Sequence, residues 1–432
     1  MNHHILRIYL ACLMLASSLV HADNFTYPEG NPFLATIVGT PPAMIAPVPD
    51  EVNVRQTDLS VTVLPDRHLP PVLSHYRKLH YRLAWQNKPA PLVFLIAGTG
   101  SGYNNATMDY LKRVFWQAGM HALVLSSPTN HDFIAAASRS GLPGLGLRDA
   151  RDLHTAMSIA AAHARDTKKL DITEYRLVGF SLGALNAAFV AHLDKDLNQF
   201  NFTRTLLLNP PVDLYTSIRR LDSLARTRIK GVTNANSFYE HIFQKLARYY
   251  DERADTDIES GLFYGIQRSD EALTEPELAM LIGAVFRFAA ADLSFMSDLV
   301  TGGGRYAPAH KPLKVSTSLT PYLRRALYCD FDCYLSTQLW PVWSSANAGK
   351  TLDDMAWETS LYSLESFLRD SSDIATLTNA DDFILTEDNY LFLANTFGER
   401  AFIFPRGGHG GNLQHTDVVA TILTFMEASQ DD

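Results

Sequence analysis

Cysteine, net positive charge and long apolar runs are all scarce in this chain of 432 residues. The three cysteines are too few for a disulfide-rich scaffold, and none has further cysteines or histidines at ligand spacing, so no metal site is expected. The formal net charge is −9 without a long basic run, which argues against a nucleic-acid partner. With 47% hydrophobic and 11% aromatic residues, the composition is instead that of a folded protein with a large core.

The first 22 residues resemble a secretory signal peptide. Arg7 gives a weakly positive start, residues 8–16 are apolar, and residues 20–22 offer a small-residue cleavage site. An N-terminal helix that is never cleaved is the alternative. Because no later stretch is both long and apolar without charges, we expect a periplasmic or secreted protein with no transmembrane segment in its mature chain. Peripheral contact with a membrane stays open.

Cys329 and Cys333 are the cysteines that remain after removal of such a signal peptide. In an oxidising compartment, two thiols this close in the chain are expected to form a disulfide. Cys12 lies inside the signal segment, and too little apolar sequence precedes it to favour a lipid anchor there.

Short apolar strands alternate with helices in two parts of the chain, residues 61–213 and 371–432. The expected strands are at residues 92–96, 121–125, 175–178, 205–208, 374–377 and 401–404. This alternation predicts an α/β domain with a mostly parallel sheet and helices on both faces.

Two other segments depart from the alternation. Residues 23–60 are rich in proline and lack periodicity, which predicts an extended leader over the domain surface. Residues 214–370 have the pattern of helices only, and a capping box of Thr274 and Glu277 opens a long apolar helix there. We expect this segment to be a helical cap inserted in the domain. Most of its aromatic residues should pack in the cap core and the rest should line an apolar pocket; they are Phe286, Phe288, Phe295, Trp340, Trp343 and Trp357.

The pentapeptide Gly179-Phe180-Ser181-Leu182-Gly183 follows an apolar strand and opens a helix of small residues. A nucleophile elbow needs this context, because its turn is so tight that the positions two before and two after the serine must be small. The turn exposes the serine Oγ and leaves the next backbone N–H free to donate. We therefore predict Ser181 as a nucleophile and the Leu182 N–H as an oxyanion donor. A serine that only caps the helix is the alternative.

A glycine-rich loop at residues 97–102 follows an earlier strand. A second oxyanion donor is expected in this position, and we assign it to the backbone N–H of Thr99, with Gly100 as the alternative. A dinucleotide-binding loop is the rival interpretation, but the G-x-G-x-x-G spacing is incomplete and no acidic residue ends the next strand. No cofactor is expected.

The loops after the last two strands supply a base and an acid. His409 lies in a glycine-rich loop from which it can reach the nucleophile, and His415 is the weaker candidate. Asp382 lies in the preceding loop, where it would orient the imidazole and stabilise its protonated form. Asp381 and Asp388 remain alternatives to Asp382, because sequence alone places a loop carboxylate poorly.

The strand–helix rhythm together with the segments G-F-S-L-G, A-G-T-G, N-A-D-D-F and G-G-H-G resembles the α/β-hydrolase superfamily. N-A-D-D-F is similar to the acid loop of the YheT-like branch of esterases. The resemblance covers roughly residues 75–213 and 371–430. It implies an eight-stranded, mostly parallel sheet and ester hydrolysis through an acyl-enzyme, with Ser181, Asp382 and His409 as the triad. The sequence departs from the family pattern at Ala97, where a histidine is common, and in its all-helical insertion.

These expectations combine into an exported serine hydrolase that cleaves small-molecule or lipid acyl esters. A capped serine peptidase would use the same triad together with a cap carboxylate for the substrate amine. An acyltransferase would differ only in keeping water from the acyl-enzyme. A non-catalytic relative that binds or handles lipids would be expected to lack part of the machinery, whereas all parts are present in this sequence.

Overall fold

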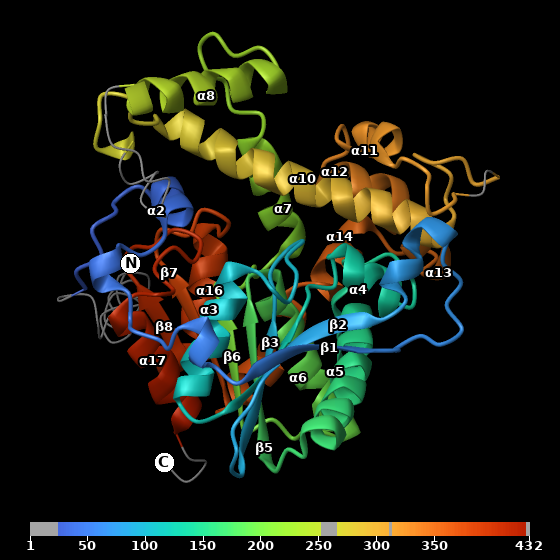
Figure 1. Cartoon of the computed structure of the whole chain (residues 1–432), viewed down its shortest axis with the longest axis vertical. Helices are drawn as coiled ribbons and strands as arrows, with labels where there is room; N and C mark the ends of the chain where they lie inside the picture. The colour runs from blue at the N-terminus through green and yellow to red at the C-terminus, as the bar shows by residue number, and fades with distance from the viewer. Residues whose placement is uncertain (1–24, 252–265, 311–312, 429–432) are drawn as a thin grey trace, which may run out of the picture.

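The computed structural model describes residues 25–251, 266–310 and 313–428, so the expected signal peptide at residues 1–22 lies outside the described residues. Its centre is an eight-stranded sheet in the order β1-β2-β4-β3-β5-β6-β7-β8 (Figure 1). β2 pairs antiparallel with both β1 and β4, and the other pairs are parallel. The strands are β1 (Gln56–Val61), β2 (Leu79–Ala84), β3 (Ala90–Ile96), β4 (His121–Leu125), β5 (Ile172–Phe180), β6 (Arg204–Leu208), β7 (Ile374–Asn379) and β8 (Ala401–Phe404).

Helices cover both faces of the sheet, which explains why its middle strands are apolar on both sides. One face is covered by α3 (Ala106–Gln117) and α17 (Thr416–Glu427), and the other by α5 (Gly146–Lys168), α6 (Leu182–Leu197) and α16 (Glu387–Phe397). The mostly parallel α/β sheet predicted from the sequence is confirmed. The short elements around it are α4 (His131–Ala136), η1 (Pro42–Met44), η2 (Glu51–Asn53), η3 (Pro71–Tyr76) and η6 (Gly398–Arg400).

The leader differs from the extended segment expected at residues 23–60. Residues Pro32–Val38 form helix α2, and strand β1 already begins at Gln56. The Asn31 side chain caps α2 by accepting two backbone hydrogen bonds, both of 3.0 Å. A helix of seven residues is too short to show periodicity in a sequence, and tertiary packing around the buried Leu34 stabilises it here.

The described elements between β6 and β7 are all helical, and among them α10 runs across the top of the molecule, over the carboxyl edge of the sheet (Figure 1). α10 starts at the capping box of Thr274 and Glu277. Cys329 and Cys333 form a disulfide beside α12. The cap elements are α7 (Leu214–Leu224), α8 (Ala235–Asp251), α10 (Glu275–Thr301), α11 (Thr320–Ala326), α12 (Phe331–Tyr334), η4 (Leu335–Leu339), α13 (Trp340–Ala346), α14 (Leu352–Glu358), η5 (Leu361–Leu364) and α15 (Glu365–Asp370).

Helix α10 is long and apolar. Its 27 residues reach a mean hydropathy of 1.7 over their most apolar window, which is enough by length and composition to cross a membrane. Arg287 and Asp292 lie within this helix, so it does not contradict the expectation that no later stretch is long and apolar without charges. Half of that window is buried inside the protein, and packing in the cap core accounts for its composition.

The aromatic residues of the cap divide between its core and its surface. Phe295 and Trp343 are buried, and Phe286 and Trp340 are partly buried against the core. Phe288 and Trp357 are instead 51% and 57% exposed.

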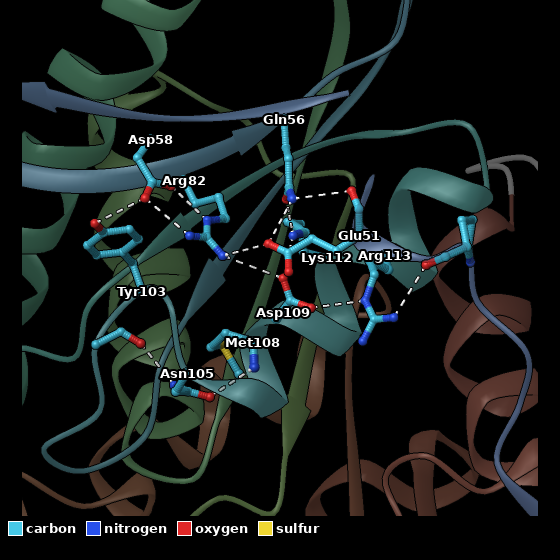
Figure 2. A network of polar contacts seen from close by, with 12 residues as sticks. Glu51, Gln56, Asp58, Arg82, Tyr103, Asn105, Met108, Asp109, Lys112 and Arg113 are labelled. Carbon is cyan, nitrogen blue, oxygen red and sulfur yellow. Dashed lines mark hydrogen bonds and ion pairs between the residues drawn. The ribbon is translucent and has the colours of Figure 1, made fainter. Parts of the chain in front are cut away.

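A polar network fastens the antiparallel edge of the sheet to α3 (Figure 2). Asp109 of α3 accepts a hydrogen bond of 2.5 Å from Lys112 and pairs with Arg113 at 3.0 Å and with Arg82 at 3.6 Å. Arg82 of β2 also pairs with Asp58 of β1 at 2.7 Å. The Lys112 side chain is fully buried, and this burial lowers the pKa of its ammonium, although Asp109 opposes the shift. Three cations therefore depend on the Asp109 carboxylate.

Asp109→Asn should lower the free energy of unfolding by about 3 kcal/mol, because it leaves a buried ammonium without its counter-charge. Adding Lys112→Met should recover about 1 kcal/mol or more, because it removes that ammonium. Urea unfolding of the single and double variants measures both effects. A double variant less stable than Asp109→Asn would contradict the role given to Lys112.

Candidate active site

Ser181 lies between β5 and α6 with a φ of 54° and a ψ of −124°. Such a conformation costs about 1–3 kcal/mol and persists only where the surrounding structure enforces it. Here the enforcing neighbours are backbone atoms. A Cβ on Gly179 would lie 2.0 Å from the Gly183 carbonyl oxygen, and one on Gly183 would lie 2.2 Å from the Ile96 carbonyl oxygen. The turn therefore requires glycine at both positions, as an elbow does.

Three side chains from three loops meet at the carboxyl edge of the sheet. The His409 Nε2 lies 2.8 Å from the Ser181 Oγ, and the His409 Nδ1 lies 3.0 and 3.2 Å from the two carboxylate oxygens of Asp382. All three residues are buried. With Nδ1–H donating to the carboxylate, Nε2 is left to accept from the serine hydroxyl.

The other candidate acids and base lie elsewhere. Asp381 accepts hydrogen bonds of 2.9 and 3.3 Å from two backbone N–H groups of the histidine loop (residues 406–412), and burial raises its pKa. Asp388 is exposed in the first turn of α16. His415 caps α17 and accepts a backbone hydrogen bond of 3.2 Å. Of the three aspartates, the structure brings Asp382 to His409.

The two predicted oxyanion donors belong to segments that lie next to Ser181. Leu182 is the first residue of α6, so its N–H has no partner within the helix. The loop that holds Thr99 passes close to the serine, since a Cβ on Gly98 would lie 3.2 Å from the Ser181 Cβ. The alternative donor, the N–H of Gly100, already donates to a threonine hydroxyl at 2.8 Å. The geometry therefore favours Thr99 over Gly100.

Helix α2 holds the histidine loop from outside. The Thr36 Oγ1 accepts a hydrogen bond of 2.8 Å from the His409 N–H. The backbones are so close that a Cβ on Gly408 would lie 2.1 Å from the Pro32 carbonyl oxygen. Sequence reasoning missed Thr36, and no local signal could have revealed it, because the contact joins residues that are 373 positions apart.

Asparagines support the acid and the histidine loop from inside. Asn209 follows β6 and donates from Nδ2 to the Asp382 Oδ2 at 3.1 Å. Asn379 donates to the Gly408 carbonyl at 2.8 Å and accepts from Asn412 at 2.6 Å. Asn379 stands in the N-A-D-D-F segment and Asn412 directly follows the loop glycines, so these two could have been found. Nothing in the sequence pointed to Asn209.

The cap touches the glycine-rich loop through α10. A Cβ on Gly100 would lie 3.0 Å from the Ala289 Cβ. Close by, the His131 Nδ1 of α4 lies 3.1 Å from the Asp292 Oδ2 of α10. The hydrogen bond to Asp292 raises the pKa of His131, although burial opposes the shift. A titratable pair thus links the cap to the carboxyl edge of the sheet.

This pair should stabilise the folded protein at low pH. The pKa of His131 is higher in the folded protein than in the unfolded chain, so the contribution is complete below about pH 6.5 and is lost as the pH rises through the folded value. Asp292→Asn should lower the melting temperature by about 1–2 °C at pH 5.5 and by less at pH 9. Thermal unfolding at both pH values measures the difference, and an equal loss at both would contradict an ionic contribution.

No protein-family model matches the chain, and no curated protein does. Among solved structures, an esterase of Pyrococcus furiosus has 10% identity and a TM-score of 0.40, over 89% of this chain and 97% of that one. A hyperthermophilic esterase of Pyrobaculum calidifontis has 13% identity and a TM-score of 0.40, over 97% of both chains. A proline iminopeptidase of Mycobacterium smegmatis has 12% identity and a TM-score of 0.40, over 86% of this chain and 98% of that one. These similarities are too low to carry an inference about function, and the assignment rests on the sheet and the elbow described above: the chain has the α/β-hydrolase fold.

Proposed function

We propose that this protein is an exported serine hydrolase that cleaves carboxylic esters with Ser181, His409 and Asp382. The observation that carries the proposal is the continuous line of hydrogen bonds from the Ser181 Oγ through the imidazole to the Asp382 carboxylate, at 2.8 and 3.0 Å. A serine hydroxyl is a weak nucleophile, and an adjacent imidazole that takes its proton makes it reactive.

In the first half of the reaction, the Ser181 Oγ attacks the ester carbonyl carbon while its proton passes to the His409 Nε2. The carbonyl oxygen becomes an oxyanion, to which the N–H groups of Leu182 and Thr99 donate. The intermediate then collapses. The alcohol leaves with the proton from His409, and the acyl group stays on Ser181.

In the second half, water gives a proton to His409 and attacks the acyl carbon. Collapse releases the carboxylic acid and returns the proton to the Ser181 Oγ. Asp382 stays ionised, holds the Nδ1–H and stabilises the imidazolium. The Asn209 amide restrains this carboxylate through its hydrogen bond to Oδ2.

Ser181→Ala should keep the fold and lower ester turnover by a factor on the order of 10⁶. Asp382→Asn should lower it by about 10⁴, because the amide carries no charge to stabilise the imidazolium and its NH₂ group can hold the imidazole in the wrong tautomer. Asp388→Asn, the same change at an exposed carboxylate, is the control and should cost little. Hydrolysis of p-nitrophenyl butyrate measures all three, and fluorophosphonate labelling maps the nucleophile. Wild-type turnover in Ser181→Ala would refute the assignment, and a chain that is neither labelled nor active would favour a non-catalytic role.

The surroundings of His409 favour an apolar acyl substrate, including lipid esters. The ring centroids of Phe180 and Phe383 lie 5.6 and 6.1 Å from the centroid of the imidazole. The ring of Phe33, from α2, lies 5.0 Å from that of Phe383. Apolar rings beside the imidazole favour an alkyl chain over the charged amine of an aminopeptidase substrate.

Acyl esters of medium or long chain should therefore be hydrolysed faster than acetate esters and aminoacyl anilides. Each buried CH₂ contributes about 0.8 kcal/mol, so kcat/KM should rise several-fold per two carbons until further carbons are no longer buried. A series of p-nitrophenyl esters of increasing acyl length, measured beside aminoacyl anilides, tests this. A flat series or faster anilide cleavage would refute the proposal of a lipid-like substrate, but it would not affect the proposal that Ser181 is the nucleophile. Transfer to added alcohols in preference to water would favour an acyltransferase.

Export is supported by the signal-like residues 1–22 and by the disulfide between Cys329 and Cys333, a bond typical of oxidising compartments. N-terminal sequencing of the mature protein should place the first residue close to position 23, and a retained Met1 would contradict cleavage.

A further inference from the structure

The cap contains a cavity of about 700 Å³ that is separate from the region around Ser181. It lies between the connection from α7 to α8, the start of α8, and α10. Its apolar walls include Ile229, Phe238, Tyr239, Met280, Ala284 and Phe288. Cavities of about 300–1,000 Å³ are the usual size of ligand sites.

Helix α10 separates this cap cavity from the candidate active site. Met280, Ala284 and Phe288 follow one another at intervals of four residues, so they share one face of α10. Ala289, which touches the glycine-rich loop, and Ile282, which joins the main core on the sheet, lie on another face. A ligand in the cap cavity would therefore not reach Ser181.

Positive charge gathers at the cap cavity. Arg226, Arg228 and Arg287 line it, and none of the described residues that line it is acidic. The nearby Asp330 pairs with both Arg226 and Arg287, the latter at 3.4 Å. One carboxylate thus serves two guanidinium groups. The Arg287 Nε is in addition buried and has no hydrogen-bond partner among the described residues.

The cap cavity therefore combines an apolar wall with guanidinium groups that a single carboxylate neutralises only in part. Phe288 is 51% exposed at this wall, which leaves apolar surface uncovered. Alkyl chains gain free energy by covering such surface, and guanidinium groups bind carboxylates through paired hydrogen bonds. A ligand that satisfies both features carries an anionic head on an apolar chain.

We propose that the cap cavity is a binding site for a single-chain anionic amphiphile, namely an alkyl carboxylate. The chain packs against Phe238, Met280 and Phe288, and the carboxylate accepts hydrogen bonds from Arg287 and Arg228. The site performs no chemistry. It does not depend on the proposed hydrolysis, although a fatty carboxylate is also the product class of that reaction.

Calorimetric titration of the full chain carrying Ser181→Ala with monomeric dodecanoate tests the proposal. Ala284→Trp fills the cap cavity and should weaken binding about tenfold or more, while Arg287→Met should weaken it about tenfold by removing charge-assisted hydrogen bonds. Val285→Trp is the matched control. It introduces the same side chain at a position that is 64% exposed and does not line the cavity, and it should bind like the parent.

Dodecyltrimethylammonium, which has the same chain and the opposite charge, should bind at least about tenfold more weakly than dodecanoate. Equal binding of the two surfactants would overturn the proposal. So would unchanged dodecanoate binding in Ala284→Trp and Arg287→Met variants that keep the parent melting temperature. A protein that binds anionic phospholipid vesicles but not monomeric dodecanoate, and loses the vesicle binding in Ala284→Trp, would have a membrane contact here instead. That result would equally overturn the proposal. Ester hydrolysis, measured with Ser181 restored, reports separately on the reacting site.

Discussion

The close approach of three backbone segments at the start of α6 is the constraint on which the candidate site depends. Gly179 and Gly183 allow β5, α6 and the end of β3 to meet without side chains between them. The serine between them is then forced into a strained conformation above the sheet edge, and the burial of the small, apolar α6 offsets this strain. Neighbouring strands supply the rest in spatial order: Asn209 follows β6, Asp382 follows β7 and His409 follows β8.

A second level of support comes from elements outside the sheet. Helix α2 lies between the histidine loop and the cap, because Thr36 binds the His409 backbone while Leu34 packs in a cluster with Phe238 and Leu278. The cap in turn reaches the glycine-rich loop through α10. Both ends of the candidate site are thus held by segments far away in the sequence. The histidine loop packs against α2 of the leader, and the glycine-rich loop packs against α10 of the cap.

Much of the fold could be predicted from the sequence, because apolar strands, small elbow residues and glycine-rich loops are local signals. The choice between Asp381 and Asp382 could not be made in this way. Adjacent carboxylates point in different directions, and the path of the loop sends one to the backbone and the other to the imidazole. Thr36 and Asn209 escaped prediction for the same reason: their roles arise from tertiary contacts. The proposed reaction of Ser181, His409 and Asp382 stays a prediction.

The contact between α2 and the histidine loop also has a consequence for how the chain matures. Synthesis produces α2 near the beginning and His409 near the end, and a helix of seven residues does not persist alone in water. The nucleophile elbow can form once β5, β3 and α6 are present. His409 reaches the serine only after β8 has joined the sheet, and the histidine loop is held in place only after α2 has docked on it. The serine therefore lacks its histidine partner until β8 and α2 have both docked, so any hydrolytic competence depends on two segments that are far apart in the sequence.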